Sequence, residues 1–382
     1  MDEGPQRRSI VSRRAAVGGL AALASAPILF DSKAKGQVAS GAPTPGYNWH
    51  YPASAWLARR EEAAIEPDLE VVDAHHHLWD HPGDRFLFDK LLSYVTSGHK
   101  ITDTVFVECG SMYRDDGPVE LQPVGETEFV NGVAAMSASG KYGNARLCRG
   151  IVGYADLRLG EKVTNVLEGH LRASGRFRGV RFDLNWDPSP MLPVARNRPG
   201  KDRMDDPIWR AGFSRLAPLG LVFDAYVYHP QLRQLIDLAR AFPETTIVLN
   251  HSGTPLGIGP YRDKKAETFA QWKQSILELA KYGNVVVKLG GLGMAHGMFD
   301  FYDRDRPPSS EEMALAYKPY IETCIQAFTP QRSMFESNFP PDESSGNYTV
   351  LWNAMKRLAA GYNQAEKQLM FSGTAKRVYN LI

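Results

Sequence analysis

Three histidines stand in a row in the stretch VVDAHHHLWD, residues 71–80, directly after an apolar pair and an aspartate. Successive side chains of a strand point to opposite faces, so Asp73, His75 and His77 are expected on one face and His76 on the other. His75 and His77 can then converge on one ion or one substrate. His76 is expected to point toward the surrounding helices, where it needs only a hydrogen-bond partner.

A later apolar run, TTIVLNHSG, ends in a further histidine, His251. Imidazole is a common ligand of zinc and similar divalent ions, and three imidazoles leave one coordination position open for water. An ion held in this way lowers the pKa of bound water and polarises a carbonyl group. His75, His77 and His251 are therefore expected either to bind a divalent metal, zinc or manganese, or to polarise a carbonyl group directly without one.

These histidines need a fold that brings distant segments together, and apolar runs of strand length alternate along the chain with amphipathic segments of helix length. The expected strands are Leu69–His77, Thr102–Cys109, Leu147–Ala155, Gly179–Leu184, Leu221–Tyr228, Thr246–His251, Val285–Leu289 and Met334–Asn338. The expected helices include Glu126–Ser139, Lys162–Ala173, Pro207–Ala217, Gln231–Arg240, Ala266–Tyr282 and Glu311–Phe328. Such alternation implies parallel strands joined by right-handed crossovers. Eight units over about 300 residues favour an α/β fold of the (β/α)8 TIM-barrel type.

Active sites of this barrel lie at the carboxyl ends of the strands. Polar side chains occupy these ends, namely Arg181, Asp183 and Asn185 in the fourth strand, Asp224, Tyr226 and Tyr228 in the fifth, His251 in the sixth, Lys288 in the seventh, and Glu336 with Asn338 in the eighth. His229 follows at the start of a helix. A buried polar group costs free energy unless it has a partner, so a functional site explains this set better than packing does.

Two cations in this set have both a binding and a structural explanation. The planar guanidinium of Arg181 suits a substrate anion, but an ion pair with Asp183 or Asp224 would also satisfy it. Lys288 lies inside an apolar strand, where a lysine is rare without a task. It is expected either to contact substrate or to form an ion pair with Glu336 or Asp224 at the barrel mouth.

Aromatic side chains near the strand ends could form a wall for a ring-shaped substrate, although core packing explains each of them equally well. These aromatic residues are Trp79, Tyr113, Trp186, Tyr226 and Tyr228, and Met112 is expected beside them. His296 follows a glycine-rich segment and is expected on a lid over the site. The other histidines, His50, His81, His99 and His170, are expected at the surface or in a second layer.

The chain has 382 residues and a formal net charge of +1 with scattered basic residues, so nucleic acid is not an expected partner and a small molecule is. An oligomer is compatible with this composition. Residues 1–40 resemble a twin-arginine-like signal peptide with a spacer, and the apolar run 15–30 is too short to span a membrane. We therefore expect export to the periplasm without stable membrane insertion, an N-terminal arm over 41–68 and the barrel over 69–382.

Seven segments together resemble the amidohydrolase-related proteins of the amidohydrolase superfamily: VVDAHHHLWD, VFVECGSMYR, RGVRFD, DAYVYHPQL, IVLNHSG, VVVKLGGLGM and MFESNFPPD. The branch that they resemble includes lactonases acting on sugar-acid lactones and on 2-pyrone-4,6-dicarboxylate. The resemblance implies that His75, His77 and His251 line the site and that Arg181 grips a substrate carboxylate or hydroxyl.

The chain departs from the family pattern at Asn338, because the family usually has an aspartate there that orients or deprotonates water. Asparagine cannot accept a proton, so Asn338 is assigned to substrate binding. Glu336 and Asp342 are the nearest replacements for the missing base. His251 and His229 are further candidates, since histidine titrates near neutral pH.

The sequence thus predicts a hydrolase that opens a lactone or similar cyclic ester or amide carbonyl by water attack at the barrel mouth. In this site Arg181, Asp183, Tyr226, Lys288 and Tyr113 would contact the substrate. Two alternatives stay open. One is a metal-dependent, non-oxidative decarboxylase of an aromatic or muconate-type acid, and the other is a barrel that binds a ligand without catalysis.

Overall fold

The computed structural model describes residues 52, 54–81, 83–193, 195–197 and 199–381. The predicted signal peptide and spacer, the first part of the predicted arm and His50 lie outside these residues. Among the helices that the structure describes, none is both long and apolar enough to cross a membrane.

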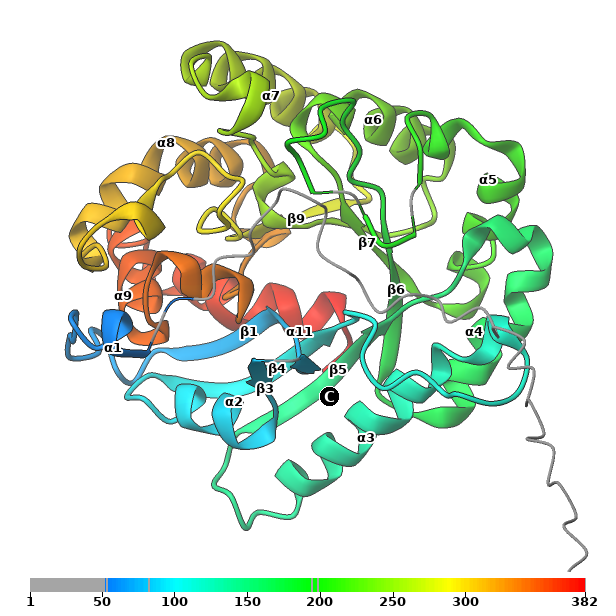
Figure 1. Cartoon of the computed structure of the whole chain (residues 1–382), viewed down its shortest axis with the longest axis horizontal. Coiled ribbons are helices and arrows are strands. Elements are labelled where there is room, and N and C mark those ends of the chain that lie inside the picture. The colour runs from blue at the N-terminus through cyan, green and yellow to red at the C-terminus, as the bar shows by residue number, and fades with distance from the viewer. Residues whose placement is uncertain (1–51, 53, 82, 194, 198, 382) are drawn as a thin grey trace, which may run out of the picture. The chain divides into compact units, whose positions relative to one another are not determined.

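Eight parallel strands form one sheet in chain order (Figure 1). They are β1 (Glu70–His76), β4 (Lys100–Val107), β5 (Arg146–Gly153), β6 (Phe177–Asp183), β7 (Val222–Tyr226), β8 (Ile247–Leu249), β9 (Val285–Leu289) and β10 (Ser333–Phe335). The segment after β10 approaches the end of β1, where the Asn338 amide donates to the His75 carbonyl at 2.8 Å and His76 forms a parallel bridge with Phe339. The sheet therefore curls into a nearly closed barrel, in agreement with the predicted TIM-barrel class.

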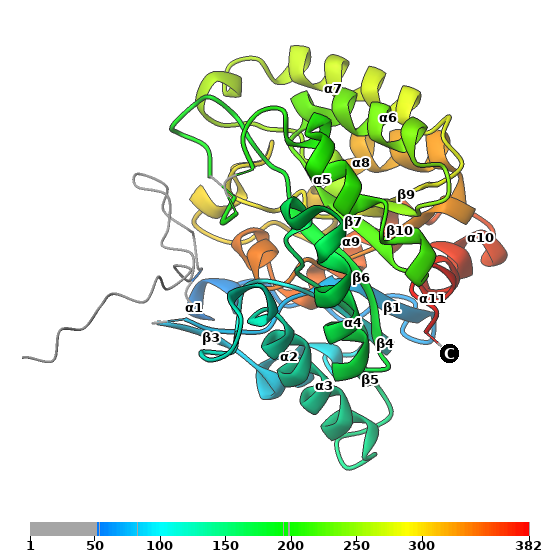
Figure 2. The ribbon, with the colours of Figure 1, turned by 90° about the vertical axis from the view of Figure 1, so that its right-hand side faces the viewer.

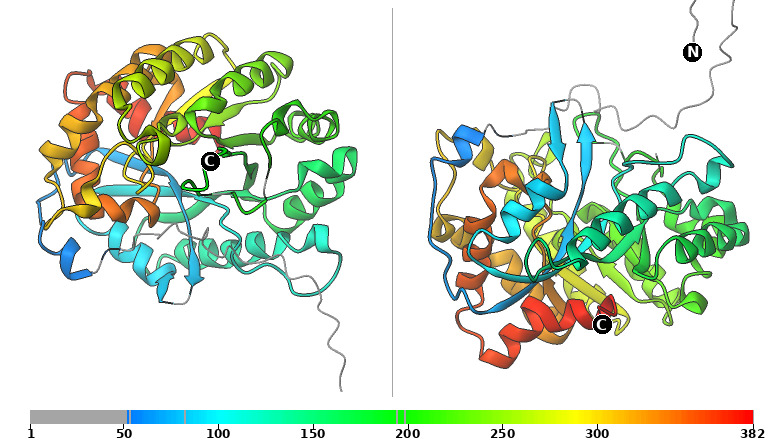
Figure 3. Two further views of the ribbon diagram at one scale, coloured as in Figure 1. Left: turned by 45° about the horizontal axis from the view of Figure 1, so that its top comes forward. Right: turned by 90° about the horizontal axis from the view of Figure 1, so that it is seen from below.

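Helices surround the strands (Figure 3). They are α2 (Phe88–Val95), α3 (Val124–Ala138), α4 (Val163–Ala173), α5 (Pro207–Phe213), α6 (Leu232–Ala241), α7 (Lys265–Leu279), α8 (Ser310–Phe328), α9 (Tyr348–Leu358), α10 (Gln364–Gln368) and α11 (Thr374–Val378). Side-chain caps fix where several of them begin; Asp206, for example, accepts from the amides of Ile208 and Trp209 at the start of α5. The sequence analysis did not identify α2, the hairpin of β2 (Trp79–His81) and β3 (Asp84–Phe86), or the helices after β10.

The sixth and the eighth predicted strands end earlier than expected. The predicted strand Thr246–His251 ends at Leu249, and His251 lies in the following 3-10 turn with φ 54°. The predicted strand Met334–Asn338 ends at Phe335, and Asn338 has φ 53°. Both polar residues therefore stand on turns beyond the strands, where the backbone leaves the alternating pattern.

Two layers fill the inside of the barrel. An apolar layer comprises Val72, Ala74, Val105, Val107, Val152, Val222, Val248, Val286 and Met334, together with Ala375, Tyr379 and Leu381 of the C-terminal segment. Polar side chains follow two positions later in several strands, as Asp224 follows Val222 and Lys288 follows Val286, so the polar layer is nearer the carboxyl ends. The C-terminal segment closes the other end, where α10 continues through the π-helical turn Leu369–Gly373 into α11 (Figure 2).

The described part of the predicted arm lies against the start of α8 and along α9. The Asn353 side chain accepts from the Ile65 amide at 2.9 Å and donates to Glu62 and to the Ala63 carbonyl. The buried Lys356 ammonium donates to the carbonyls of Ile65 and Glu66 and contacts His99 Nδ1 at 2.9 Å. We call Glu62, Asn353, Lys356 and His99 the arm clamp.

Candidate active site

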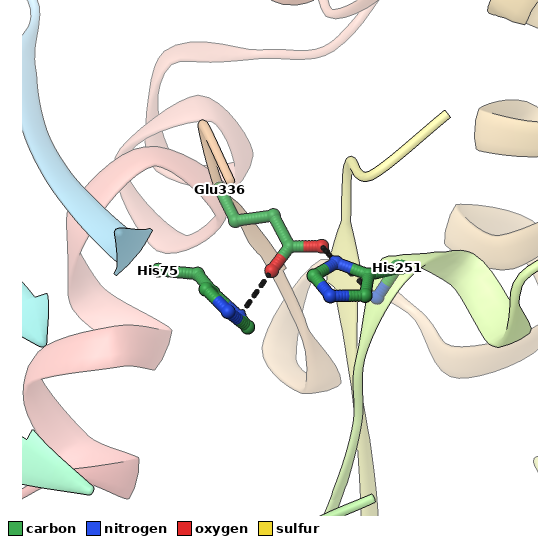
Figure 4. A group of neighbouring side chains, drawn as sticks. All are labelled: His75, His251 and Glu336. Carbon is green, nitrogen blue, oxygen red and sulfur yellow. Dashed lines mark hydrogen bonds and ion pairs between the residues drawn. The ribbon is translucent and has the colours of Figure 1, made fainter. Parts of the chain in front are cut away.

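The barrel mouth brings together three histidines and one glutamate from the ends of three strands, β1, β8 and β10, and Figure 4 shows His75, His251 and Glu336 of this group. Glu336 Oε2 lies 3.0 Å from His75 Nδ1, and Glu336 Oε1 lies 2.9 Å from His251 Nδ1. His77 Nδ1 lies 2.8 Å from the Val107 carbonyl oxygen. The Nε2 atoms of His75 and His77 face each other at 3.2 Å. Each ring thus has an acceptor at its Nδ1 atom.

An imidazole whose Nδ1–H donates to an acceptor has a lone pair on Nε2, and metal-binding histidines are held in this way by carboxylates and carbonyls. Burial, with the nearby charge of Lys288, holds the pKa of His75 well below its usual value, and burial with Arg181 does so for His77. Two neutral rings with Nε2 lone pairs 3.2 Å apart repel unless a cation or a proton lies between them. Two nitrogen ligands of tetrahedral zinc stand about 3.3 Å apart, so the donor set fits such an ion.

His75, His251 and Glu336 also form a group whose potential ligand atoms all lie within 4.8 Å of one another. This group replaces His77 of the predicted trio by Glu336. Both Glu336 oxygens already contact imidazole Nδ1 atoms, so the glutamate is better placed to orient His75 and His251 than to bind an ion itself.

The strand alternation predicted for β1 holds for the histidines and fails for Asp73. The pairing of β1 with β4 shifts register between Asp73 and His76. As a result the Asp73 carboxylate accepts from the hydroxyls of Ser337 at 2.6 Å and Tyr348 at 2.9 Å, on the side of α9. His76 contacts the Thr104 hydroxyl at 2.8 Å and lies outside the site. The expectation that Asp73 shares the face of the two site histidines is wrong.

The glycine-rich run KLGGLG, residues 288–293, begins at the end of β9 and explains how these side chains fit. A Cβ atom at Gly291 would lie 2.3 Å from the Cβ of His251, and one at Gly290 would lie 2.5 Å from the Cγ of Glu336. Gly291 also has φ 65°, a conformation that glycine adopts at no steric cost. These glycines allow the backbone to approach the site closely.

Lys288 forms the ion pair that was one of its two expected roles. Its ammonium lies 2.7 Å from Asp224 Oδ2 and 3.2 Å from His75 Nδ1. Asp224 accepts in addition from Asn250 Nδ2 at 2.9 Å and from the Tyr379 hydroxyl at 2.9 and 3.0 Å. Sequence reasoning missed Asn250 and Tyr379; Tyr379 comes from the opposite end of the barrel, and no local pattern marks it.

Arg181 is paired with carboxylates of the chain, but with Glu108 and Asp183 and not with Asp224. Its Nε lies 2.9 Å from Glu108 Oε1 and 3.3 Å from Asp183 Oδ1. A second guanidinium, Arg196, donates to Glu108 Oε2 at 2.5 Å and to the Tyr113 hydroxyl at 3.3 Å. Burial raises the pKa of Glu108, but Arg196 and Arg181 outweigh it and lower that pKa overall.

Asp183 differs from its carboxylate neighbours in both charge balance and exposure. Burial raises its pKa more than Arg181 lowers it, and Glu108 raises it further. Its side chain is 15% exposed, whereas those of Glu108, Glu336 and Asp224 are 0% exposed. Water can therefore reach Asp183 most readily of these four.

The predicted aromatic wall is only partly assembled. Tyr226 packs edge-on against His251 with ring centroids 5.2 Å apart, and its hydroxyl lies 3.1 Å from His296 Nε2. His296 is fully buried on the loop after β9, and burial lowers its pKa to about 3. Trp79 stacks on His77, with ring centroids 5.9 Å apart. Met112 is 45% exposed and does not belong to a closed wall.

Two predicted bases are poorly suited to that role. His229 accepts from the Leu256 amide at 3.3 Å, packs on Tyr261 and has no contact with the site histidines among the described residues. Burial raises the pKa of Asp342 well above its usual value, and its oxygens accept from Asn338 Nδ2 at 3.0 Å and the Gly293 amide at 3.2 Å. Both oxygens of Asp342 therefore already accept hydrogen bonds from the chain, which leaves this carboxylate poorly placed to take a proton from water.

Comparison with known proteins gives this geometry a family. The sequence pattern described as amidohydrolase matches residues 72–381. The chain belongs to the amidohydrolase family. Protein y4mH of Sinorhizobium fredii is 31% identical over 82% of this chain and 99% of its own length. An L-fucono-1,5-lactonase of Burkholderia multivorans is 25% identical over 81% of this chain and 96% of its own length.

Solved structures of this family share the fold. A zinc-bound amidohydrolase from Burkholderia multivorans aligns over 82% of this chain and 99% of its own, with a TM-score of 0.64 and 23% identity. Membership of the amidohydrolase family agrees with the observed barrel and with the resemblance of the seven sequence segments. Family membership also makes a small molecule the expected substrate.

Proposed function

We propose that this amidohydrolase opens a lactone or similar ester-like carbonyl by water attack at the barrel mouth. The observation that carries the proposal is the arrangement of His75, His77 and His251, each with an acceptor oxygen within 3.0 Å of its Nδ1 atom, a position that favours a lone pair on Nε2. Lactonase relatives that align over most of the chain support this reaction class.

A divalent metal, zinc or manganese, would be held by the Nε2 atoms of His75, His77 and His251. When bound, such an ion polarises the substrate carbonyl and lowers the pKa of water. Glu336 fixes the orientation of two of the three rings, and the Val107 carbonyl fixes the third. The zinc-bound relative supports this choice of ion.

Asp183 is our choice for the group that accepts the proton from the attacking water. Asn338 cannot do so, both oxygens of Asp342 already accept hydrogen bonds, and both oxygens of Glu336 contact imidazoles. Asp183 combines a raised pKa with access to water, which suits a general base. Arg181, held between Glu108 and Asp183, would orient the substrate.

The mouth also offers acceptors for substrate hydroxyl groups. The side-chain oxygens Asn185 Oδ1 and Asn338 Oδ1 are buried and have no hydrogen-bond partner among the described residues. A hydroxylated lactone ring would supply the donors that these oxygens lack. We therefore propose a sugar-acid lactone as the substrate class, with Tyr226 along one side of the ring.

The test is a panel of sugar-acid lactones assayed by acid release, with protein that is metal-free or loaded with zinc or manganese. Metal content is measured by mass spectrometry of the native protein. Hydrolysis that needs metal and is lost in His75→Gln supports the proposal. No hydrolysis of any lactone by metal-loaded protein would reject it.

A non-oxidative decarboxylase is the second candidate, because the family's aspartate is missing at position 338 and the Asp342 carboxylate is already hydrogen-bonded, which weakens any route that depends on water activation there. Decarboxylation consumes no water, so these residues would not limit it. Release of carbon dioxide from aromatic or muconate-type acids would favour this alternative over the lactonase.

Export to the periplasm is a separate proposal that rests on residues 1–40. Expression of the full chain, followed by fractionation and N-terminal sequencing of the periplasmic protein, tests it. Full-length protein retained inside the cell would contradict export.

A further inference from the structure

The C-terminal segment enters the barrel from the end opposite to the site. Tyr379, just after α11, is fully buried, and its hydroxyl donates to Asp224 at 2.9 and 3.0 Å. Gly150 of β5 makes room for this segment, because a Cβ atom there would lie 2.9 Å from Leu381 Cδ2. A hydroxyl is thus delivered into an apolar layer to meet one carboxylate.

From Asp224 the contacts continue to the group His75, His77, His251 and Glu336, which we call the imidazole site. Lys288 Nζ lies 2.7 Å from Asp224 Oδ2, 3.2 Å from His75 Nδ1 and 5.2 Å from the centre of the Tyr379 ring. Asp224, Lys288, His75 and Tyr379 are all 0% exposed, so solvent screens none of these interactions.

His75 Nδ1 stands between two groups that favour opposite tautomers. An ammonium group can only donate, so Lys288 favours a bare Nδ1 and a proton on Nε2. Glu336 Oε2, at 3.0 Å, favours the proton on Nδ1 and leaves the Nε2 lone pair free. Which tautomer His75 adopts depends on how firmly Asp224 holds the Lys288 ammonium.

We propose that Tyr379 is a positioning residue for the imidazole site: through Asp224 it holds Lys288 so that His75 keeps its Nε2 lone pair. This inference rests on the proposed use of His75 in the site. Tyr379 is the only group among the described residues that donates to Asp224 Oδ1. Without the hydroxyl that oxygen is left unpaired in the barrel, the carboxylate turns to recover a partner, and the ammonium moves with it.

The test uses the full chain with Tyr379→Phe, which keeps the ring and its packing, and Asp224→Asn, which removes the charge that holds the ammonium. Loss of partners one step outside the ligands changes metal affinity about 10- to 100-fold. Being further from the ligands, Tyr379→Phe should weaken zinc binding about threefold and Asp224→Asn about tenfold. In metal-free protein labelled with 15N-histidine, the His75 signals should move toward the tautomer protonated at Nε2.

Tyr320→Phe is the matched control, because Tyr320 is also a mostly buried tyrosine but lies on α8 in contact with Phe269 and Trp272. It should leave zinc affinity and the His75 signals unchanged. Unchanged zinc affinity and unchanged His75 signals in either Tyr379→Phe or Asp224→Asn would overturn the inference, and Asp224→Asn keeps the test decisive if Tyr379→Phe does not fold. Lactone hydrolysis by the wild type tests the proposed function alone, so the two failures are distinguishable.

Discussion

The arm clamp and the imidazole site both bury charged and polar groups, but they differ in how these groups are satisfied. In the arm clamp, Lys356 has three acceptors for its three donors, from Ile65, Glu66 and His99. Asn353 likewise uses both its oxygen and its nitrogen within the chain. Nothing in this cluster lacks a partner that a ligand would have to provide.

In the imidazole site the opposite holds. His75 and His77 turn their Nε2 atoms toward each other, so two lone pairs repel. A proton on one Nε2 would remove this repulsion, but the acceptors Glu336 and Val107 beside the Nδ1 atoms favour the protons there. A buried polar network in which every group has a hydrogen-bond partner contributes to stability. A buried network in which lone pairs converge is suited to bind a ligand such as a cation. The two regions should therefore respond in opposite ways to substitution.

The largest expected effect is the loss of activity in His75→Gln. Removal of one ligand should lower kcat/KM for a lactone about 1000-fold, equivalent to about 4 kcal/mol of transition-state stabilisation, and should abolish stoichiometric zinc binding. The melting temperature of the metal-free protein should change little, because the strained Nε2 contact disappears. If His75→Gln lost much stability but kept its activity, His75 would be a structural residue like those of the arm clamp.

Asp183→Asn should lower kcat about 100-fold while zinc content stays at the wild-type level, since a general base contributes about 100- to 10,000-fold. A base acts when deprotonated, and burial raises the pKa of Asp183. Activity of the wild type should therefore rise with pH through a value above the usual aspartate range, and this limb should vanish in the variant. Asp205→Asn, in an exposed ion pair on the same connection, is the control.

Lys356→Met should act on stability alone. It leaves the Ile65 carbonyl and the His99 Nδ1 atom without this donor and removes one of the two donors to the Glu66 carbonyl, and an unsatisfied buried acceptor costs about 1–3 kcal/mol. Urea unfolding should show a loss of about 2 kcal/mol with an unchanged kcat/KM per folded molecule. A loss of activity in folded protein would show that the arm clamp also serves the site.

Local alternation along a strand is enough to predict that His75 and His77 meet, because the side-chain period of two needs no knowledge of the rest of the fold. The same rule fails for Asp73, since the register shift between Asp73 and His76 depends on pairing with β4. It also misplaces His251 and Asn338, which stand on turns with positive φ. The barrel class was predictable from the spacing of the apolar runs, but not these local departures.

Other members of the site come from segments without any periodic signal. Arg196 lies on the long connection between β6 and α5, and Tyr379 follows the last helix. Glu108 was within reach of the sequence argument, because an acid directly after the apolar run VFV is unusual for packing. Contacts such as Arg196 to Glu108 depend on tertiary closure, which a single sequence does not specify.

The smallest expected effect concerns Glu62, at the edge of the arm clamp, and the pH dependence of stability. Its carboxylate accepts from the Ser310 amide at 2.8 Å and from Asn353 Nδ2 at 3.0 Å. Burial raises its pKa, but these hydrogen bonds and the charge of Arg357 outweigh burial and lower it below 4.5. The unfolded chain therefore binds more protons in that window, so stability from Glu62 is present above about pH 4.5 and is lost as the pH falls through the folded pKa.

Glu62→Gln should remove this contribution and flatten the acid limb of the unfolding free energy by less than about 1 kcal/mol, because the group is largely solvated. Urea titrations between pH 3 and pH 7 would measure it, with Glu311→Gln, an exposed neighbour on α8, as the control. Lactone hydrolysis should not change at any pH at which the variant is folded. A matching shift in the pH profile of kcat would mean that the arm reaches the imidazole site, and the division between the two regions would fail.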